Sequence, residues 1–244
     1  MKNTKTYLAA LGAVVIQTVT GIQSASAYDL STDYSATQNP TGVWSYGGTA
    51  TLGGAFTLFN NHHSSPGDNG VIVDVWTFSS GSPQIWHNGT GNTVTGDGGQ
   101  GIYPPGTIEL ISGGNGVASA FGVARFTVPQ GGAGNYLLQT SARNYLNGPS
   151  SADSDFHVLD NGAQLFVAQI LPSTTAPGTL YSYSANLNLV AGDTIDFVVG
   201  RGLDGNGNFS GVNLNASLTL VPEPGTFALA GLGAAAMLLA RRRK

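Results

Sequence analysis

The clearest structural signal in the chain is DFHVLDNGAQLFVAQI, residues 155–170. Apolar and polar residues alternate on both sides of Asn161-Gly162, which is the period of a β-strand with one buried face. An Asn-Gly pair between two such runs is the strongest short-range hairpin signal, because a type I′ turn requires positive φ at both central residues. The sequence therefore predicts two antiparallel strands, 155–160 and 163–170, joined by a tight turn.

The same alternation recurs between residues 43 and 220, and no stretch of this body has the 3.6-residue period of a helix. We therefore expect an all-β body, a two-sheet antiparallel β-sandwich of the jelly-roll type. One domain is favoured because no Pro/Ser linker divides it. The other predicted strands are 43–46, 55–59, 71–78, 83–87, 108–111, 119–128, 136–145, 180–190, 194–200 and 212–220. The predicted loops, rich in turn-forming residues, are 61–70, 88–101 and 204–208.

The aromatic content separates a folded body from a linker of similar composition. The chain has 36 Gly, but it also has 3 Trp, 10 Phe and 9 Tyr, which is too many for a flexible linker. There is no Cys, so disulfides and thiol chemistry are excluded.

The charges are unevenly distributed along the chain. Six of the nine cations lie near the two ends, so residues 28–221 carry three Arg against twelve acidic residues, a net charge of −9. Such a surface repels a phosphate backbone. Nucleic acid is therefore not an expected partner.

The last 24 residues, VPEPGTFALAGLGAAAMLLARRRK, have three parts. A stiff Pro222-Glu223-Pro224 precedes an uncharged apolar run, 226–240, and a basic tail, 241–244. This order predicts a transmembrane helix, shorter than the roughly 20 residues that usually span a bilayer, with Arg241, Arg242, Arg243 and Lys244 as the membrane stop on the cytoplasmic side.

The first 27 residues have the features of a secretory signal peptide. Lys2 and Lys5 precede an apolar run, 7–19, and the segment ends in the small-residue pattern Ala25-Ser26-Ala27. We expect cleavage after Ala27; a retained N-terminal anchor is the alternative. The predicted organisation is a signal peptide (1–27), a β-sandwich (28–221) and a C-terminal segment (222–244).

The Pro-Glu-Pro tripeptide, the short apolar run and the terminal RRRK together resemble the PEP-CTERM sorting signal of Gram-negative bacteria. The resemblance implies export with the help of signal peptidase, and then recognition of Pro222, Glu223 and Pro224 by an exosortase that cleaves nearby. It also implies a place at the cell surface or in the extracellular matrix, anchored in the membrane before processing, and a link to biofilm and exopolysaccharide.

A second resemblance covers most of residues 38–220. The segments that carry it are NPTGVWSYG (39–47), ARFTVP (124–129), DFHVLDNGAQLF (155–166), LVAGDTIDFVVG (189–200) and DGNGN (204–208). They are similar to bodies found in many PEP-CTERM proteins and to carbohydrate-binding, galactose-binding-like jelly rolls. The resemblance implies carbohydrate binding.

The candidate sugar-binding residues are Trp86, Asn88 and Tyr103. Sugar sites place an aromatic face against the sugar ring and use polar side chains for the hydroxyl groups. Trp86 and Tyr103 lie at loop edges, whereas Trp44 and Tyr46 lie inside a strand and are weaker candidates. The alternative for each aromatic residue is a place in the core.

Two loops offer candidate metal ligands. Asp204, Asn206 and Asn208 place oxygen atoms at alternate positions, as the start of a calcium loop does, but Phe209 stands where the loop needs Gly. A structural calcium ion and a plain glycine-rich turn are the alternatives; no other cofactor is expected. His62-His63 with Asp68 lacks a further spaced zinc ligand and is interpreted as solvated.

No catalytic residue is predicted. Asp153, Asp155, His157 and Asp160 lie close together in sequence, but no nucleophile motif accompanies them, and we interpret them as turn and surface residues. The expected function is that of a non-enzymatic surface or matrix protein that binds or organises exopolysaccharide. The alternatives are a purely structural or adhesive matrix protein without a defined ligand, and a hydrolase acting on polysaccharide.

Overall fold

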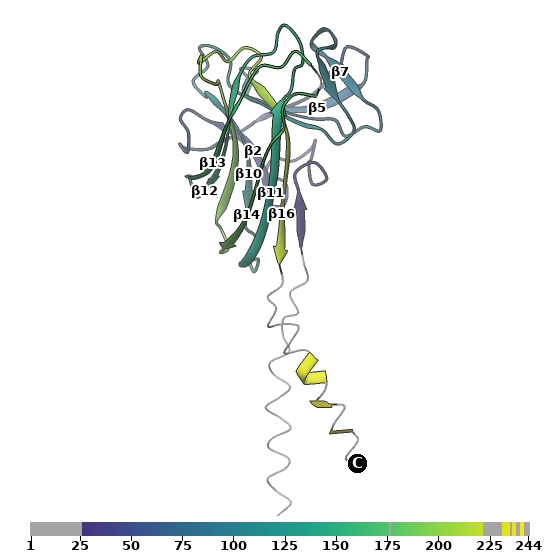
Figure 1. Ribbon diagram of the computed structural model, residues 1–244, viewed down its shortest axis with the longest axis vertical. Coiled ribbons are helices and arrows are strands. Elements are labelled where there is room, and N and C mark those ends of the chain that lie inside the picture. The colour runs from purple at the N-terminus through teal and green to yellow at the C-terminus, as the bar shows by residue number, and fades with distance from the viewer. Residues whose placement is uncertain (1–25, 176, 222–230, 235, 238–239, 242–244) are drawn as a thin grey trace, which may run out of the picture. The chain divides into compact units, whose positions relative to one another are not determined.

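The structure is a computed structural model, which describes residues 26–175, 177–221, 231–234, 236–237 and 240–241. Residues 27–220 form one compact unit, which consists of two antiparallel sheets and a short ribbon (Figure 1). This confirms the predicted all-β, two-sheet antiparallel sandwich. The finer assignment to the jelly-roll type stays a prediction.

The larger sheet has eight strands in the order β14-β11-β16-β9-β6-β5-β4, with β1 paired beside β16. Its members are β1 (Ala27–Asp29), β4 (Asn61–Pro66), β5 (Ile72–Thr77), β6 (Gln84–His87), β9 (Ile108–Ile111), β11 (Gly134–Asn144), β14 (Tyr181–Leu189) and β16 (Gly211–Val221).

The smaller sheet has six strands in the order β13-β12-β15-β10-β2-β3. Its members are β2 (Trp44–Thr49), β3 (Thr57–Leu58), β10 (Phe121–Thr127), β12 (Ser154–Asp160), β13 (Ala163–Ile170) and β15 (Thr194–Gly200). A separate ribbon is formed by β7 (Val94–Gly96) and β8 (Gly101–Tyr103), which are joined by the short 3-10 helix η1 (Asp97–Gly99).

The main core lies between the two sheets, where alternate residues of each strand point inward. On β15, the inward residues are Ile195, Phe197 and Val199, as the alternation predicts. Removal of this apolar surface from water is what chiefly stabilises the sandwich. The largest fully buried side chains are Trp44, Tyr46, Tyr136, Phe59, Phe126, Phe156 and Phe197. Trp44 and Tyr46 are therefore core residues.

The hairpin of residues 155–170 forms as predicted. β12 pairs antiparallel with β13, and the two turn residues both have positive φ, 49° at Asn161 and 82° at Gly162. A register shift between Val158 and Leu159 marks a bulge that the alternation did not predict.

Two predicted loops contain strands, and these predictions were wrong. Residues 61–66 form β4, which pairs with β5 at the edge of the larger sheet. The side chains of β4 are mostly exposed, and the segment therefore shows no alternation of apolar and polar residues. Only its backbone pairing with β5 makes it a strand. Residues 94–96 and 101–103 form the ribbon β7–β8, whose strands are too short for a periodic signal.

The predictions for the two ends fall mainly on residues outside the described part. These are the signal peptide up to residue 25, Pro222, Glu223 and Pro224, most of the segment 226–240, and Arg242, Arg243 and Lys244. The described residues 231–234, 236–237 and 240–241, which include Arg241, are helical. Among the described residues, no helix has the length and apolar character needed to cross a membrane.

Candidate functional site

A row of side chains crosses the outer face of the larger sheet, opposite the core. The strand registers place Val75 beside Trp86, Trp86 beside Glu109, and Glu109 beside Asn213. Their chain neighbours, such as Ile85 and Leu110, point into the core. Because successive side chains of a strand point to opposite faces, this row lies on the face turned away from the smaller sheet.

The ribbon β7–β8 covers part of this outer face and closes a second, smaller core against it. Figure 1 shows β7 at the same end of the larger sheet as β5. The side chains of this second core are Val73, Val75, Val94, Tyr103, Tyr145 and Leu146, with Val71 and Trp86 packed against them. The ribbon is held over the sheet by this apolar contact.

A cavity of about 230 Å³ lies between the ribbon and the sheet. Aromatic rings and carboxyl groups line it together. The aromatic residues are Trp86, Tyr103 and Tyr145, the acidic residues are Asp68, Asp97 and Glu109, and the remaining lining residues are Pro66, Gly67, Val94, Thr95, Gly96 and Ile111. We refer to this space as the aromatic cavity.

Two of the three predicted sugar-binding residues meet in the aromatic cavity. Trp86 is half-buried, and its indole N–H donates a hydrogen bond to Gln84 Oε1, which fixes the ring. Tyr103 is 5% exposed, and its hydroxyl lies 3.5 Å from Asp97 Oδ2. A Cβ atom at Gly101 would collide with this hydroxyl, so glycine at that position is what makes room for the Tyr103 ring.

The third predicted residue, Asn88, organises the loop that leads to the ribbon. Its side-chain N–H groups donate to the carbonyl oxygens of Asn92 and Tyr103, each at 2.8 Å. Its Oδ1 accepts from the backbone N–H and the hydroxyl of Thr90, at 3.1 and 2.7 Å. Because these hydrogen bonds occupy its amide group, Asn88 holds the backbone of Tyr103 in place and does not line the cavity.

Burial raises the pKa of two carboxyl groups of the cavity, Glu109 and Asp97. Glu109 is 3% exposed. Burial raises its pKa well above the ordinary value, and the charge of Asp97 raises it further, while a hydrogen bond with Tyr103 acts in the opposite direction. Asp97 lies at the rim, where partial burial and the nearby charge of Asp68 raise its pKa.

Sequence reasoning missed Asp68, Asp97, Glu109 and Tyr145 as members of this site. Glu109 gave one available signal, since it is a single acidic residue within the otherwise apolar strand 108–111. A carboxyl group buried in such a strand is expected to have a partner or a functional role, because its transfer from water costs several kcal/mol when it has no partner. The sequence pattern suggests Asp68 only as a zinc ligand.

Two further hollows lie on the same outer face of the larger sheet. One, of about 170 Å³, lies at Pro104, Thr107, Arg143, Asn213 and Asn215. The other, of about 480 Å³, shares Asn215 with it and is lined by polar side chains of β11, β14 and β16. Because Asn213 is the direct neighbour of Glu109, the three spaces lie in succession along one face. We call them together the polar track.

The predicted calcium loop is held by its own hydrogen bonds. Asp204 Oδ1 accepts from the backbone N–H of Asn206 at 2.8 Å, and Asn206 Oδ1 accepts from Asn208 N–H at 3.1 Å and from the Asn115 side chain at 2.8 Å. Within the described residues, no three His, Cys, Asp or Glu side chains are placed to hold a metal ion. Calcium at this loop stays a prediction.

The histidine pair of β4 is divided between the two faces of the strand, because successive side chains alternate. The His62 ring packs against Trp76 in a tilted arrangement, with ring centroids 5.0 Å apart, and its Nε2 lies 3.3 Å from Asp74 Oδ1. Asp68 lies in the next loop, where Oδ2 accepts from the backbone N–H of Gly99. His62 and Asp68 therefore each have a structural partner of their own.

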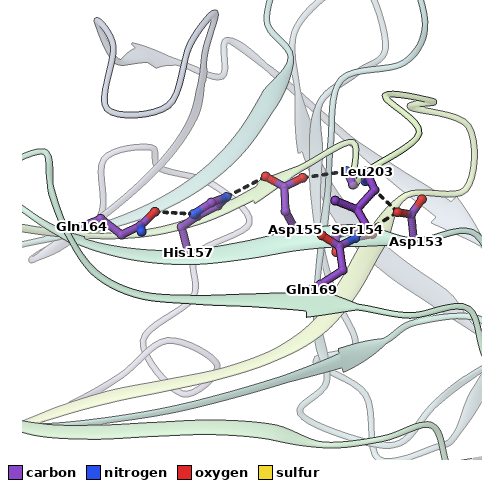
Figure 2. A network of polar contacts seen from close by, with 8 residues as sticks. Asp153, Ser154, Asp155, His157, Gln164, Gln169 and Leu203 are labelled. Atoms are coloured by element: carbon purple, nitrogen blue, oxygen red, sulfur yellow. Dashed lines mark hydrogen bonds and ion pairs between the residues drawn. The ribbon is translucent and has the colours of Figure 1, made fainter.

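The acidic cluster beside the hairpin forms a hydrogen-bond network that holds the loop after β15 in place (Figure 2). His157 Nε2 lies 2.6 Å from Asp155 Oδ2, and its Nδ1 lies 2.8 Å from Gln164 Oε1. Asp155 and Asp153 accept backbone N–H groups of Gly202 and Leu203, at 2.6 and 2.7 Å. Both ring nitrogens face oxygen atoms, an arrangement that favours the doubly protonated form of the ring.

Hydrogen bonds within this network shift the pKa values of His157 and Asp155 toward their charged forms. Burial lowers the pKa of His157, but the hydrogen bonds to Asp155 and Gln164 outweigh it, so the pKa is raised. Burial raises the pKa of Asp155, but the bonds from His157 and Gly202 outweigh it, so the pKa is lowered. Asp160 lies at the end of β12; partial burial and the charge of Asp193 raise its pKa.

Comparison with protein families identifies the C-terminal segment. A model described as the PEP-CTERM protein-sorting motif matches residues 220–244. The motif implies export and sorting to the cell surface by an exosortase, which confirms the prediction from Pro222-Glu223-Pro224 and the basic tail. No curated protein matches the chain in sequence.

Comparison with solved structures finds proteins whose folds resemble the sandwich. The CBM51 module of Clostridium perfringens GH95, in complex with methyl-galactose, is 13% identical, with a TM-score of 0.38 over 79% of this chain and 99% of that one. The C-terminal CBM6 of the laminarinase LamC from Zobellia galactanivorans is 12% identical, with a TM-score of 0.28 over 73% of this chain and 99% of that one.

A third similar structure is the exo-β-1,3-galactanase of Phanerochaete chrysosporium with galactose, at 14% identity and a TM-score of 0.29 over 81% of this chain. The match spans 30% of the galactanase chain. The body thus resembles carbohydrate-binding β-sandwich modules at low identity, as predicted.

Proposed function

We propose that this exosortase-sorted protein binds exopolysaccharide along the polar track and takes one sugar unit of that polymer into the aromatic cavity. It acts at the surface or in the extracellular matrix of a Gram-negative bacterium, anchored by its C-terminal segment before processing. The observation that carries the proposal is the succession of three hollows on one face, with aromatic rings at one end.

The chemistry of the track fits a hydroxyl-rich chain. Its largest hollow is lined by Asp29, Gln139, Thr140, Ser141, Ser182, Tyr183, Ser184, Asn215, Ala216 and Ser217. Several of these are exposed amides and hydroxyls, which donate and accept hydrogen bonds as sugar hydroxyls do. Asn213 Oδ1, in the middle hollow, is a buried acceptor without a partner among the described residues.

The cavity suits a single sugar unit rather than a longer piece. Its volume of about 230 Å³ lies below the roughly 300–1,000 Å³ of sites for drug-sized ligands. Trp86 and Tyr103 supply the ring faces that pack on the apolar side of a sugar. The carboxyl groups of Asp97 and Glu109 can hydrogen-bond its hydroxyl groups.

The protein acts as a binder and not as an enzyme in this proposal. Asp155 and His157, the residues that a hydrolase would use at the hairpin, bind each other and the loop at Gly202. Incubation with the host's exopolysaccharide should therefore release no new reducing ends. Release that disappears in Asp155→Asn would contradict this part of the proposal.

The test of binding is retention of the full-length chain, solubilised in detergent, on the host's own exopolysaccharide. We expect saturable retention that is lost in Trp86→Ala and kept in Trp86→Phe, which retains an aromatic ring. If the unmodified chain is not retained, the proposed function fails, and the alternative of a structural or adhesive protein without a defined ligand takes its place.

A further inference from the structure

The aromatic cavity combines three carboxyl groups with three aromatic rings. Among its lining residues, all of them in the described part of the chain, there is no Lys, Arg or His. Arg143 lies on β11, two positions before Tyr145 in the chain, but its side chain lines the middle hollow and not the cavity. The ionised form of Glu109 therefore has no positive side chain in the cavity to balance it.

The unbalanced charge of an ionised Glu109 carries a free-energy cost, which a positively charged ligand would remove. Glu109 is almost completely buried, and a buried carboxylate without a counter-charge is strongly disfavoured. Burial therefore favours the protonated form of Glu109. A cation placed beside it would offset the charge and return Glu109 to its ionised form.

The aromatic rings favour the same kind of ligand. A cation within about 6 Å of the ring centre is attracted to the negative face of Trp or Tyr. Trp86 and Tyr103 come from β6 and β8, and Tyr145 follows the end of β11, so the rings reach the cavity from the sheet and from the ribbon. Rings and carboxyl groups together select positive charge and reject negative charge.

A metal ion does not fit this arrangement. Within the described residues, the acidic side chains include no set of three close enough to bind one. Calcium requires six to eight oxygen ligands at short distance. The cavity instead matches a positive charge carried on a larger organic group.

We propose that the aromatic cavity selects a sugar that bears a protonated amine, so that the polymer bound along the polar track is a polysaccharide with free amino groups. This inference rests on the proposed function, which it makes more specific. Glu109 and Asp97 bind the ammonium group, and Trp86 and Tyr103 pack against it and the ring. Sugars with an N-acetyl group or a hydroxyl at that position are bound more weakly.

The experiment compares the host's exopolysaccharide before and after chemical N-acetylation of its free amines. Acetylation removes the positive charge and leaves the backbone of the polymer unchanged. We expect retention of the full-length chain to fall by about tenfold or more, since a desolvated cation–π contact and a charge pair together exceed the 1.4 kcal/mol that a tenfold change represents. Equal retention before and after acetylation would overturn the amine inference and leave the proposed function intact.

Two variants separate recognition in the cavity from general charge attraction. Glu109→Gln keeps the shape of the side chain and removes its charge, so retention of the untreated polymer should fall toward that of the acetylated polymer. Asp33→Asn removes an exposed charge that lines none of the three hollows and should retain the polymer as the unmodified chain does. Equal losses in both variants would mean adsorption to a negative surface, and would overturn the inference. If the unmodified chain does not retain the untreated polymer, the proposed function itself fails.

Discussion

Trp86 and Glu109 are direct cross-strand neighbours, on β6 and β9, on the outer face of the larger sheet. Directly opposed residues in antiparallel strands have Cβ atoms about 5 Å apart. An indole ring and a buried carboxyl group are thereby placed side by side in the wall of one cavity. This pair defines the point at which an apolar surface and a charge could act on the same ligand.

Replacement of Trp86 by Ala should weaken saccharide binding by about 2 kcal/mol, or about 30-fold, which is typical of an aromatic residue central to a binding site. The measurement is a titration of the full-length chain with the retained polysaccharide. The melting temperature is measured in parallel, because Trp86 also packs against the second core and its removal lowers stability. Unchanged affinity in a folded variant would remove Trp86 from the site.

Glu109→Gln should stabilise the protein at neutral and alkaline pH. The pKa of Glu109 is raised in the folded state, so the folded chain holds its proton over a pH range in which the unfolded chain has released it. Stability then falls as pH rises above about 4.3, the ordinary value of Glu. The difference in melting temperature between variant and parent should be small at pH 4 and grow toward pH 8. A difference that stays constant over this range would contradict the assignment.

The Asp155–His157 pair should stabilise the protein most in mildly acidic solution. The raised pKa of His157 gives stability that is complete below about 6.5 and is lost as pH rises through its folded value. The lowered pKa of Asp155 gives stability that is present above about 3.9 and is lost as pH falls through its folded value. The advantage of the parent over His157→Gln, measured by thermal unfolding, should therefore peak between these values and shrink at pH 9.

The hairpin turn should be sensitive to a side chain at Gly162. Its φ of 82° lies in the left-handed region, where a Cβ atom costs roughly 1–2 kcal/mol. Gly162→Ala should lower the free energy of unfolding by about this amount in denaturant titration. Gly91→Ala is the matched control, because a Cβ atom there meets nothing within 4 Å and its φ is not in that region. Equal effects in both variants would argue against a strained turn.

Sorting should depend on the tripeptide at the start of the matched motif. Replacement of Pro222, Glu223 and Pro224 by Ala should leave the uncleaved chain in the membrane fraction, because the exosortase no longer recognises it. Immunoblots of membrane and surface fractions measure this. Normal trimming and release of the variant would show that these residues are dispensable for processing.

Much of the sandwich could be predicted because the information is local. Alternation on β15 places Ile195, Phe197 and Val199 on one face whatever the partner strand is, and Asn161-Gly162 sets its own turn geometry. β4 could not be predicted in this way. It is an edge strand with exposed side chains, and only the backbone groups of β5 make it a strand.

The sorting signal, the all-β body and the candidacy of Trp86 and Tyr103 can be read from the sequence, since each depends on residue types at short spacing. The tertiary structure alone decided that Glu109 lies beside Trp86, that Asp97 is carried to the same space by the ribbon, and that Asn88 supports the loop. The physical reason is that strand register and the packing of the ribbon on the sheet join residues far apart in the chain, and no local pattern records which of them will meet.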